Sequence, residues 1–147
     1  MNIRIWEAGI GTTFSERAQM QAVFNTTARG FGQFFEDWDI ILTPITALPT
    51  PQLGDTRYLT ISDNPSVLDW FHNLWKSFAY TPLTNLCGIP GLSLPLGWQE
   101  SGLPLGLHFQ ARQANDGLLL QLAAQVERAL GGRWNDGRVP ATHVTRG

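Results

Sequence analysis

The fold of this chain is decided by residues Phe78–Ala111, which read FAYTPLTNLCGIPGLSLPLGWQESGLPLGLHFQA. Two short apolar runs, Gly91–Gly97 and Pro104–Ala111, are separated by the polar, glycine-containing connection Trp98–Leu103. Runs of this length between glycine and proline residues are typical of strands. We therefore expect two adjacent strands of a buried sheet, which the chain enters through a tight turn at residues 87–90.

Helices are predicted on both sides of this stretch. Before it, Asn64 as cap and Pro65 in the first turn begin a helix whose apolar stripe includes Val67, Phe71, Leu74 and Phe78, and which ends before Thr81. One further turn is expected at residues 84–88. After it, Asp116 is expected to cap a helix at residues 117–130 that Gly131 and Gly132 terminate. The buried stripe of this last helix comprises Leu118, Leu119, Leu122, Ala123, Val126 and Leu130.

The N-terminal part of the sequence predicts a long helix followed by a strand. Residues 1–12 read as a loop or stray strand, and a capping box from Thr13 to Glu16 begins a helix that continues to about Trp38. Its apolar face comprises Phe31, Phe34, Phe35 and Trp38, with Gly30 and Gly32 indicating a kink or close packing. Residues 39–44 predict a strand buried on both faces, as in parallel sheets. The proline-rich residues 44–54 and residues 55–63 are predicted loops.

Size and composition are those of one globular domain with no electrostatic signature for nucleic acid. The chain has 147 residues, a formal net charge of −2 and a single cysteine, which excludes an internal disulfide and fits a reducing compartment. No apolar run approaches the roughly 20 residues that span a bilayer, and no secretory leader is recognisable. We therefore expect a cytoplasmic protein without membrane or nucleic-acid partners, and a loose C-terminal segment at residues 135–147.

The central motifs also resemble a known family. Residues 81–97, TPLTNLCGIPGLSLPLG, followed by GLPLGL at 102–107, are similar to the C-terminal signature of the amidase signature family, whose members hydrolyse amide bonds. The resemblance covers roughly residues 15–131. It implies an α/β fold, a fragment of a mixed β-sheet flanked by helices on both sides, with the order helix–strand–helix–two strands–helix. It also implies that substrate-pocket residues include Thr43, Pro44, Thr81, Thr84 and Asn85.

Other chemistry-bearing residues favour structural interpretations. Ser93 lies in a Gly-x-Ser-x-Pro sequence that lacks the final glycine of a nucleophile elbow, so it is expected to be a packed small residue. Cys87 has no neighbouring base and is interpreted as a buried or pocket-edge thiol. His72, His108 and His143 lack the spacing of metal ligands, and His108 is expected to be hydrogen-bonded for structural reasons. The acidic residues Glu36, Asp37 and Asp39 are interpreted as a solvated helix end. We predict no catalytic residue, metal site or cofactor within this sequence.

The resemblance leaves the catalytic groups of the family unmatched. Those enzymes use a serine nucleophile, a second serine in a cis peptide and a lysine, with a Gly/Ser-rich loop that supplies oxyanion donors. This sequence has no such loop and no adjacent serines, and its lysine, Lys76, lies in a predicted helix. We therefore expect a single domain, residues 1–147, that forms the C-terminal pocket and scaffold portion of an amidase-like enzyme. It would meet an amide substrate only in the intact enzyme.

Two alternatives stay open on the sequence. One is a non-catalytic binding or assembly module that keeps the same fold. The other is a small stand-alone enzyme built on Cys87 or His108. Strands taken from a larger sheet keep unpaired edges, and helices lose their cover, so we expect a homo-oligomer, a symmetric dimer above all, unless an N-terminal half is supplied.

Overall fold

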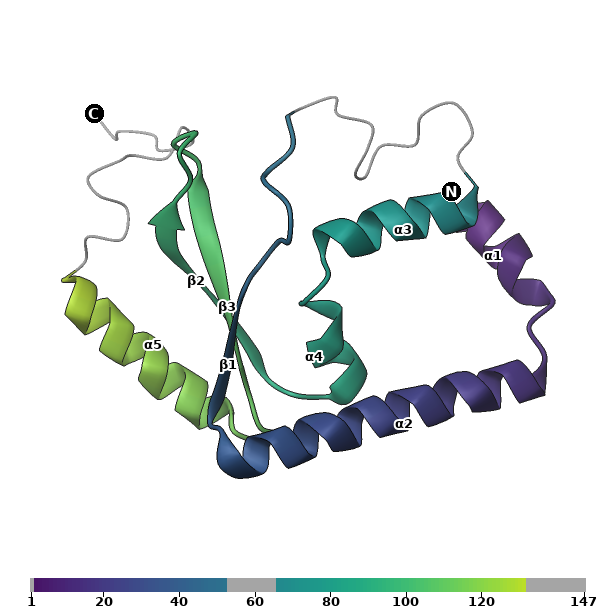
Figure 1. Cartoon of the computed structure of the whole chain (residues 1–147), viewed down its shortest axis with the longest axis horizontal. Coiled ribbons are helices and arrows are strands. Elements are labelled where there is room, and N and C mark those ends of the chain that lie inside the picture. Colours follow the sequence, from purple (N-terminus) through teal and green to yellow (C-terminus); the bar gives the residue numbers. More distant parts are fainter. Residues whose placement is uncertain (1, 53–65, 132–147) are drawn as a thin grey trace, which may run out of the picture.

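The fold combines helices with one small antiparallel sheet (Figure 1). The computed structural model describes residues 2–52 and 66–131. Its elements are, in chain order, α1 (Asn2–Ile10), α2 (Phe14–Asp37), β1 (Ile40–Pro44), α3 (Val67–Ser77), α4 (Pro82–Cys87), β2 (Gly91–Trp98), β3 (Pro104–Ala111) and α5 (Asp116–Leu130). The α/β class is confirmed.

The two apolar runs that define the sequence form an antiparallel pair, as predicted. β2 and β3 are joined by a turn in which the Gln99 amide donates to the Leu103 carbonyl at 2.8 Å. Gly102 occupies this turn with φ of 80°, a conformation that glycine adopts without steric cost. An irregularity between Pro95 and Gly97 shifts the register of β2 by one residue, which is the effect of a β-bulge.

The environment predicted for β1 is wrong. β1 pairs antiparallel with β3, from Ile40 opposite Ala111 to Pro44 opposite Leu107, and the strand order is β1-β3-β2. β1 is therefore an edge strand of the described sheet, and Leu42 is 55% exposed. An unbroken apolar run indicates burial but does not contain the direction of pairing, because the partner strand lies far away in the sequence.

The hydrophobic core lies between the sheet and α5. Leu94, Phe109, Ala111 and Leu119 are buried together, and the predicted stripe of α5 packs around them. The helix begins at Asp116 with Asn115 at the cap position, so the predicted cap is wrong by one residue, and no side-chain cap bond is formed. Gly131 ends the helix with φ of 57°, as expected of a glycine C-cap.

Helix α2 has the predicted capping box and the predicted end. The Glu16 amide donates to Thr13 Oγ1 at 3.2 Å, and the Thr13 amide donates to the Glu16 carboxylate at 2.7 Å. Trp38 is the C-cap. The helix is continuous (Figure 1), and beyond the adjoining backbone of α2 nothing lies within 4 Å of a Cβ built on Gly30 or Gly32, so the expected kink and close packing are wrong.

The interpretation of residues 1–12 as loop or strand is also wrong, because residues 2–10 form α1. Ile3, Trp6 and Ile10 repeat at helical spacing and all three side chains are exposed. The alternation of Ile3 with Ile5 suggested a strand, but a stretch this short fits both periods. α1 lies against α3.

Helix α3 is capped by Ser66, whose hydroxyl accepts from the Asp69 amide at 3.1 Å, and it ends at Ser77, before Thr81 as predicted. The predictions for Gly54, residues 55–63, Asn64, Pro65, Gly132 and residues 135–147 lie outside the described residues. The extra turn at residues 84–88 is confirmed as part of α4, which Gly88 ends with φ of 65°.

The helices away from α5 leave much apolar surface uncovered. α2 lies against α4, yet only Phe35 of its aromatic face is buried, while Phe34 is 41% and Trp38 is 63% exposed. Phe14 is 88% exposed. In the described part of the chain, none of the helices combines the length and the hydropathy that a bilayer-spanning helix needs.

Candidate functional site

The residues that the sequence placed at a substrate pocket fall into two groups. Thr81 and Asn85 line an open depression of about 490 Å³ at the junction of α3 and α4. Its other lining residues are Leu74, Trp75, Phe78 and Pro82. The wall is therefore largely apolar, and the Thr81 and Asn85 side chains provide its uncharged polar groups, which suits a neutral organic molecule.

A second cavity is also lined by Phe78. This cavity spans about 430 Å³. It is lined by Ser77 and Phe78 at the end of α3 and by five residues of the loop after β1, which are Thr46, Leu48, Pro49, Thr50 and Pro51. The Ala47 amide donates to the Ser77 carbonyl at 2.9 Å, which ties the loop to the end of α3. Because Phe78 lines both spaces, the loop after β1 and the segment from Thr81 to Asn85 flank one aromatic side chain.

Thr84 lies next to β2, and Thr43 is itself part of the sheet. Thr84 Oγ1 donates to the Thr81 carbonyl at 2.7 Å, and its methyl group would lie 3.2 Å from a Cβ on Gly91. Thr43 lies directly opposite His108 in the β1–β3 register. Pro44, also expected at the pocket, is exposed at the end of β1. Of the five predicted residues, Thr81 and Asn85 line the same described depression.

A buried polar row, formed by Thr43, His108 and Gln110, lies on the sheet face opposite the core. His108 is 5% and Gln110 is 2% exposed. Thr43 Oγ1, His108 Nδ1 and Gln110 Oε1 are each buried without a hydrogen-bond partner among the described residues. Most buried polar atoms in native proteins are paired, and each unpaired one costs about 1–3 kcal/mol. All three atoms lie on this one face of the sheet, and Trp70 Nε1 is a fourth buried atom without a partner among the described residues.

The expected structural hydrogen bond of His108 is therefore wrong at Nδ1. Burial also lowers the pKa of His108 below its ordinary value, which favours the neutral imidazole, with one nitrogen as donor and the other as acceptor. The sequence signalled the alternation of His108 with Leu107 and Phe109. The burial of Gln110 on the same face was not predicted, although Gln110 follows His108 at the two-residue period of a strand.

The His108 ring occupies space that a side chain at position 91 would otherwise fill. A Cβ on Gly91 would lie only 2.7 Å from His108 Nε2. Gly91 and Ser93 face Gln110 and His108 across the β2–β3 pair, and both are exposed. Ser93 is thus not packed as predicted, and the structure gives no hydrogen bond between Ser93 and His108, so this pair is not assembled as nucleophile and base.

The remaining candidates for chemistry are also separated. Burial raises the pKa of the half-buried Cys87 thiol, which favours the protonated, weakly nucleophilic form. His72 is exposed on α3, His143 lies outside the described residues, and Lys76 is exposed on α3. Within residues 2–52 and 66–131, no group of three His, Cys, Asp or Glu side chains could hold a metal ion, and this includes Glu36, Asp37 and Asp39.

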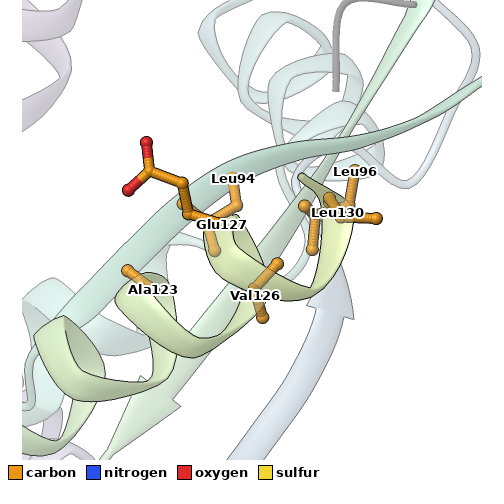
Figure 2. Close-up of a pocket in the computed structure, with 6 residues that line it drawn as sticks. All are labelled: Leu94, Leu96, Ala123, Val126, Glu127 and Leu130. Carbon is orange, nitrogen blue, oxygen red and sulfur yellow. The ribbon is translucent and has the colours of Figure 1, made fainter. Parts of the chain in front are cut away.

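A smaller apolar pocket lies between α5 and β2 (Figure 2). It spans about 290 Å³, part of which is open to solvent, and is lined by Leu94, Leu96, Ala123, Val126, Glu127 and Leu130. Figure 2 shows the Glu127 carboxylate extending away from the apolar side chains. With one carboxylate at its rim, this pocket offers no acid–base pair and belongs to the packing of α5.

Comparison with known proteins identifies the family of this chain. The family model described as amidase matches residues 5–120. The chain belongs to the amidase family, and the resemblance to the amidase signature enzymes is confirmed.

Individual relatives agree with this assignment. The chain is 39% identical over 97 residues to a putative amidase, AmiC, of Mycobacterium tuberculosis, with 66% of this chain and 19% of the relative covered. It is 33% identical over 94 residues to the 6-aminohexanoate-cyclic-dimer hydrolase of Paenarthrobacter ureafaciens, with 63% of this chain and 19% of the relative covered. The chain therefore spans about a fifth of the length of the curated relatives it matches.

Solved structures show the same likeness. The structure of 6-aminohexanoate cyclic dimer hydrolase in complex with substrate aligns with a TM-score of 0.70 at 29% identity, covering 82% of this chain and 25% of that chain. A second structure of 6-aminohexanoate cyclic dimer hydrolase aligns with a TM-score of 0.69 at 30% identity, covering 81% of this chain and 25% of that chain. The α/β architecture found here is thus that of part of an amidase-family hydrolase.

Proposed function

We propose that this chain forms a substrate-pocket wall and scaffold of an amide-hydrolysing enzyme, and that the nucleophile, its base and the oxyanion donors come from residues outside this sequence. The observation that carries the proposal is the arrangement around Phe78. Phe78 lines one cavity together with the loop after β1, and it also lines the depression that Thr81 and Asn85 border. Support also comes from the amidase match over residues 5–120.

The chemistry of the pocket wall suits substrate binding and not bond cleavage. An apolar surface with a few uncharged polar groups orients a neutral amide and excludes water, but it does not attack a carbonyl. The described residues offer no serine activated by a base and no lowered thiol pKa, and the thiol that they do contain has a raised pKa. The chain alone is therefore expected to bind weakly and to be inactive. Thr43 and Pro44, which belong to β1, and Thr84, which lies next to β2, then act as supports behind the wall.

The test is complementation. The 147-residue chain is co-expressed with a polypeptide that carries the Gly/Ser-rich part of an amidase-family enzyme, and hydrolysis of a short aliphatic amide and of the 6-aminohexanoate cyclic dimer is followed by ammonia or amine release. The proposal predicts hydrolysis only when both polypeptides are present. Changing Asn85 to Ala should then raise KM, whereas changing the exposed His72 to Ala should not. Equal activity of the Gly/Ser-rich polypeptide with and without this chain would contradict the proposal.

A non-catalytic assembly module is the second candidate, and it is supported by the surface. β1 and β2 both have an unpaired edge in the described sheet, and Phe14, Trp6 and Trp38 are among the large exposed apolar side chains. Such edges and faces favour association with another chain. We propose that the isolated chain is a cytoplasmic homodimer. Analytical ultracentrifugation at micromolar concentration tests this, and a monodisperse monomer would contradict it.

A further inference from the structure

We propose that the free edge of β1 is the surface through which two copies of this chain associate, with the two β1 strands paired antiparallel about a two-fold axis. This proposal rests on the self-association proposed above and names the surface that carries it. In the described part of the chain β1 pairs only with β3, so its other edge has no partner strand there. Unpaired strand edges are ready templates for pairing with another chain.

One hydrogen bond shows which backbone groups of β1 point to the free edge. The Ile45 amide donates to the Gly106 carbonyl, next to β1 in the ladder, at 3.1 Å. In an antiparallel pair, residues that bond the neighbouring strand alternate with residues whose N–H and C=O point away from it. Because the register of β1 is unbroken, Ile40, Leu42 and Pro44 therefore point to the free edge. Ile40 and Leu42 each offer a donor and an acceptor there, whereas Pro44 offers only an acceptor.

These outward groups are self-complementary in one register. When Ile40 of one copy lies opposite Leu42 of the partner subunit, the two residues exchange both of their hydrogen bonds, and the two-fold axis repeats the exchange. Pro44, which cannot donate, then lies beyond this ladder. Asp39 lies opposite Thr43 of the partner subunit, so the two Asp39 carboxylates do not face each other across the strands. Like charges directly opposite would have opposed the pairing.

The same register covers apolar side chains that are open to water in the single chain. Leu42 lies opposite the buried Phe109 on the core face of the sheet, yet it is 55% exposed. Ile40 of the partner subunit would lie beside it on that face, because residues directly opposite in a ladder share a face. Trp38 has an extended backbone and is 63% exposed, and it would lie opposite the exposed Pro44 of the partner subunit. The pairing thus removes apolar surface from water, which favours association.

The free edge of β2 offers less to a second copy. The Ala111 amide donates to the Pro90 carbonyl at 3.3 Å, so the same alternation directs Gly91, Ser93 and Pro95 to that edge. Their side chains are small and carry little apolar surface, and Pro95 lacks a donor. Glycine and proline both weaken strand pairing. The structure therefore favours β1 over β2 as the edge that associates.

The test is hydrogen exchange of the backbone amides in the purified 147-residue chain, measured by NMR over a range of protein concentrations with sedimentation equilibrium in parallel. The Ile40 and Leu42 amides should gain protection as the dimer forms, because they acquire acceptors on the second copy. The Ile41 and Thr43 amides already point to β3 and should gain little. The Ser93 amide at the β2 edge should exchange rapidly at every concentration.

Variants test the edge and its register. Leu42→Lys places a charge at the apolar contact and should weaken the dimer about tenfold or more. Leu120→Lys on α5 is the matched control, because Leu120 is 66% exposed and lies away from this edge, and it should leave the dissociation constant unchanged. In a Cys87→Ser background, Ile41→Cys should form a disulfide between the two copies under mild oxidation. In the proposed register, residue 41 lies opposite itself on the two-fold axis, where the Cα atoms of such a pair are about 4.5 Å apart, within the range of a disulfide.

Two results would overturn the proposal, and they separate it from self-association as such. A dimer whose Ile40 and Leu42 amides gain no protection, or which Leu42→Lys leaves intact, would refute the β1 edge while the chain still self-associates. A monomer at every concentration would refute both. If Leu42→Lys does not fold, exchange in the unchanged chain and the cross-link at position 41 decide the question. No second polypeptide is needed, so the complementation experiment is decided separately.

Discussion

Changing Gly91 to Ala tests the packing that positions the polar row. The new Cβ would lie 2.7 Å from His108 Nε2, which is 0.7 Å less than the 3.4 Å at which ordinary contact begins, and 3.2 Å from the Thr84 methyl group. Gly91 has no left-handed backbone conformation, so the cost is steric. Forced overpacking of this kind costs about 1–3 kcal/mol. For a chain of this size each kcal/mol lowers the melting temperature by about 2–4 °C.

The assay is urea unfolding of a double-mutant cycle. Gly91→Ala should destabilise the chain by about 1–3 kcal/mol, and much of this cost should disappear in a His108→Ala background, which leaves a coupling of at least about 0.5 kcal/mol. Gly30→Ala is the control, because nothing lies within 4 Å of its Cβ and alanine is favoured over glycine inside a helix by up to about 1 kcal/mol. A cost for Gly91→Ala that is absent, or that is the same in both backgrounds, would refute the reasoning.

Three further predictions concern stability. Burial lowers the pKa of His108 below 6.5, so the folded state favours the neutral ring. The stability that the neutral ring contributes should be fully present above pH 6.5 and should fall as the pH drops from about 6.5 toward the folded-state pKa. The urea midpoint of His108→Gln should lose this part of the acid dependence, whereas that of His72→Gln should keep it. Leu119 is 3% exposed and Leu120 is 66% exposed. In the same unfolding assay, Leu119→Ala should therefore destabilise the chain by about 2–5 kcal/mol, whereas Leu120→Ala should change its stability by no more than about 0.5 kcal/mol. Equal costs would contradict the placement of α5. Thr13→Ala removes the cap of α2 and should cost about 1 kcal/mol, seen as a lower urea midpoint with reduced helical circular dichroism, and an unchanged midpoint would mean that the cap is not formed in solution.

Local sequence signals predicted the elements whose ends depend on local chemistry. The capping box at Thr13, the glycine stop at Gly131 and the strand Pro104–Ala111 are all found where expected. Each is encoded within a few consecutive residues, since caps and turns satisfy backbone groups nearby. The apolar stripe of α5 was equally readable because its helical period is sustained over four turns.

What the sequence missed depends on residues that are distant along the chain. The antiparallel pairing of β1 with β3 and the meeting of Thr43 with His108 follow from sheet register, which no local pattern contains. The contact of Gly91 with the His108 ring has the same origin. α1 was missed for a different reason, since nine residues are too few to separate a helical period from a short alternation.

The likeness of the motifs to the amidase family was readable from the sequence, but the arrangement of the site was not. Thr81 and Asn85 do lie together in one depression, whereas Thr43 is part of the sheet and Thr84 lies next to β2. A motif fixes the backbone path of a segment, and the cavity that each side chain enters depends on the packing of α3 and the loop after β1. The second cavity beside Phe78 is an example, because its walls come from two segments distant in the sequence, which the Ala47–Ser77 hydrogen bond joins.

The most direct measurement of the central claim is amide hydrolysis by the purified 147-residue chain without any second polypeptide. We expect ammonia release from a short aliphatic amide to equal the uncatalysed background, and to stay there in Cys87→Ala and His108→Ala variants. Turnover above background that either substitution abolishes would contradict the account, because the catalytic groups would then lie within this chain.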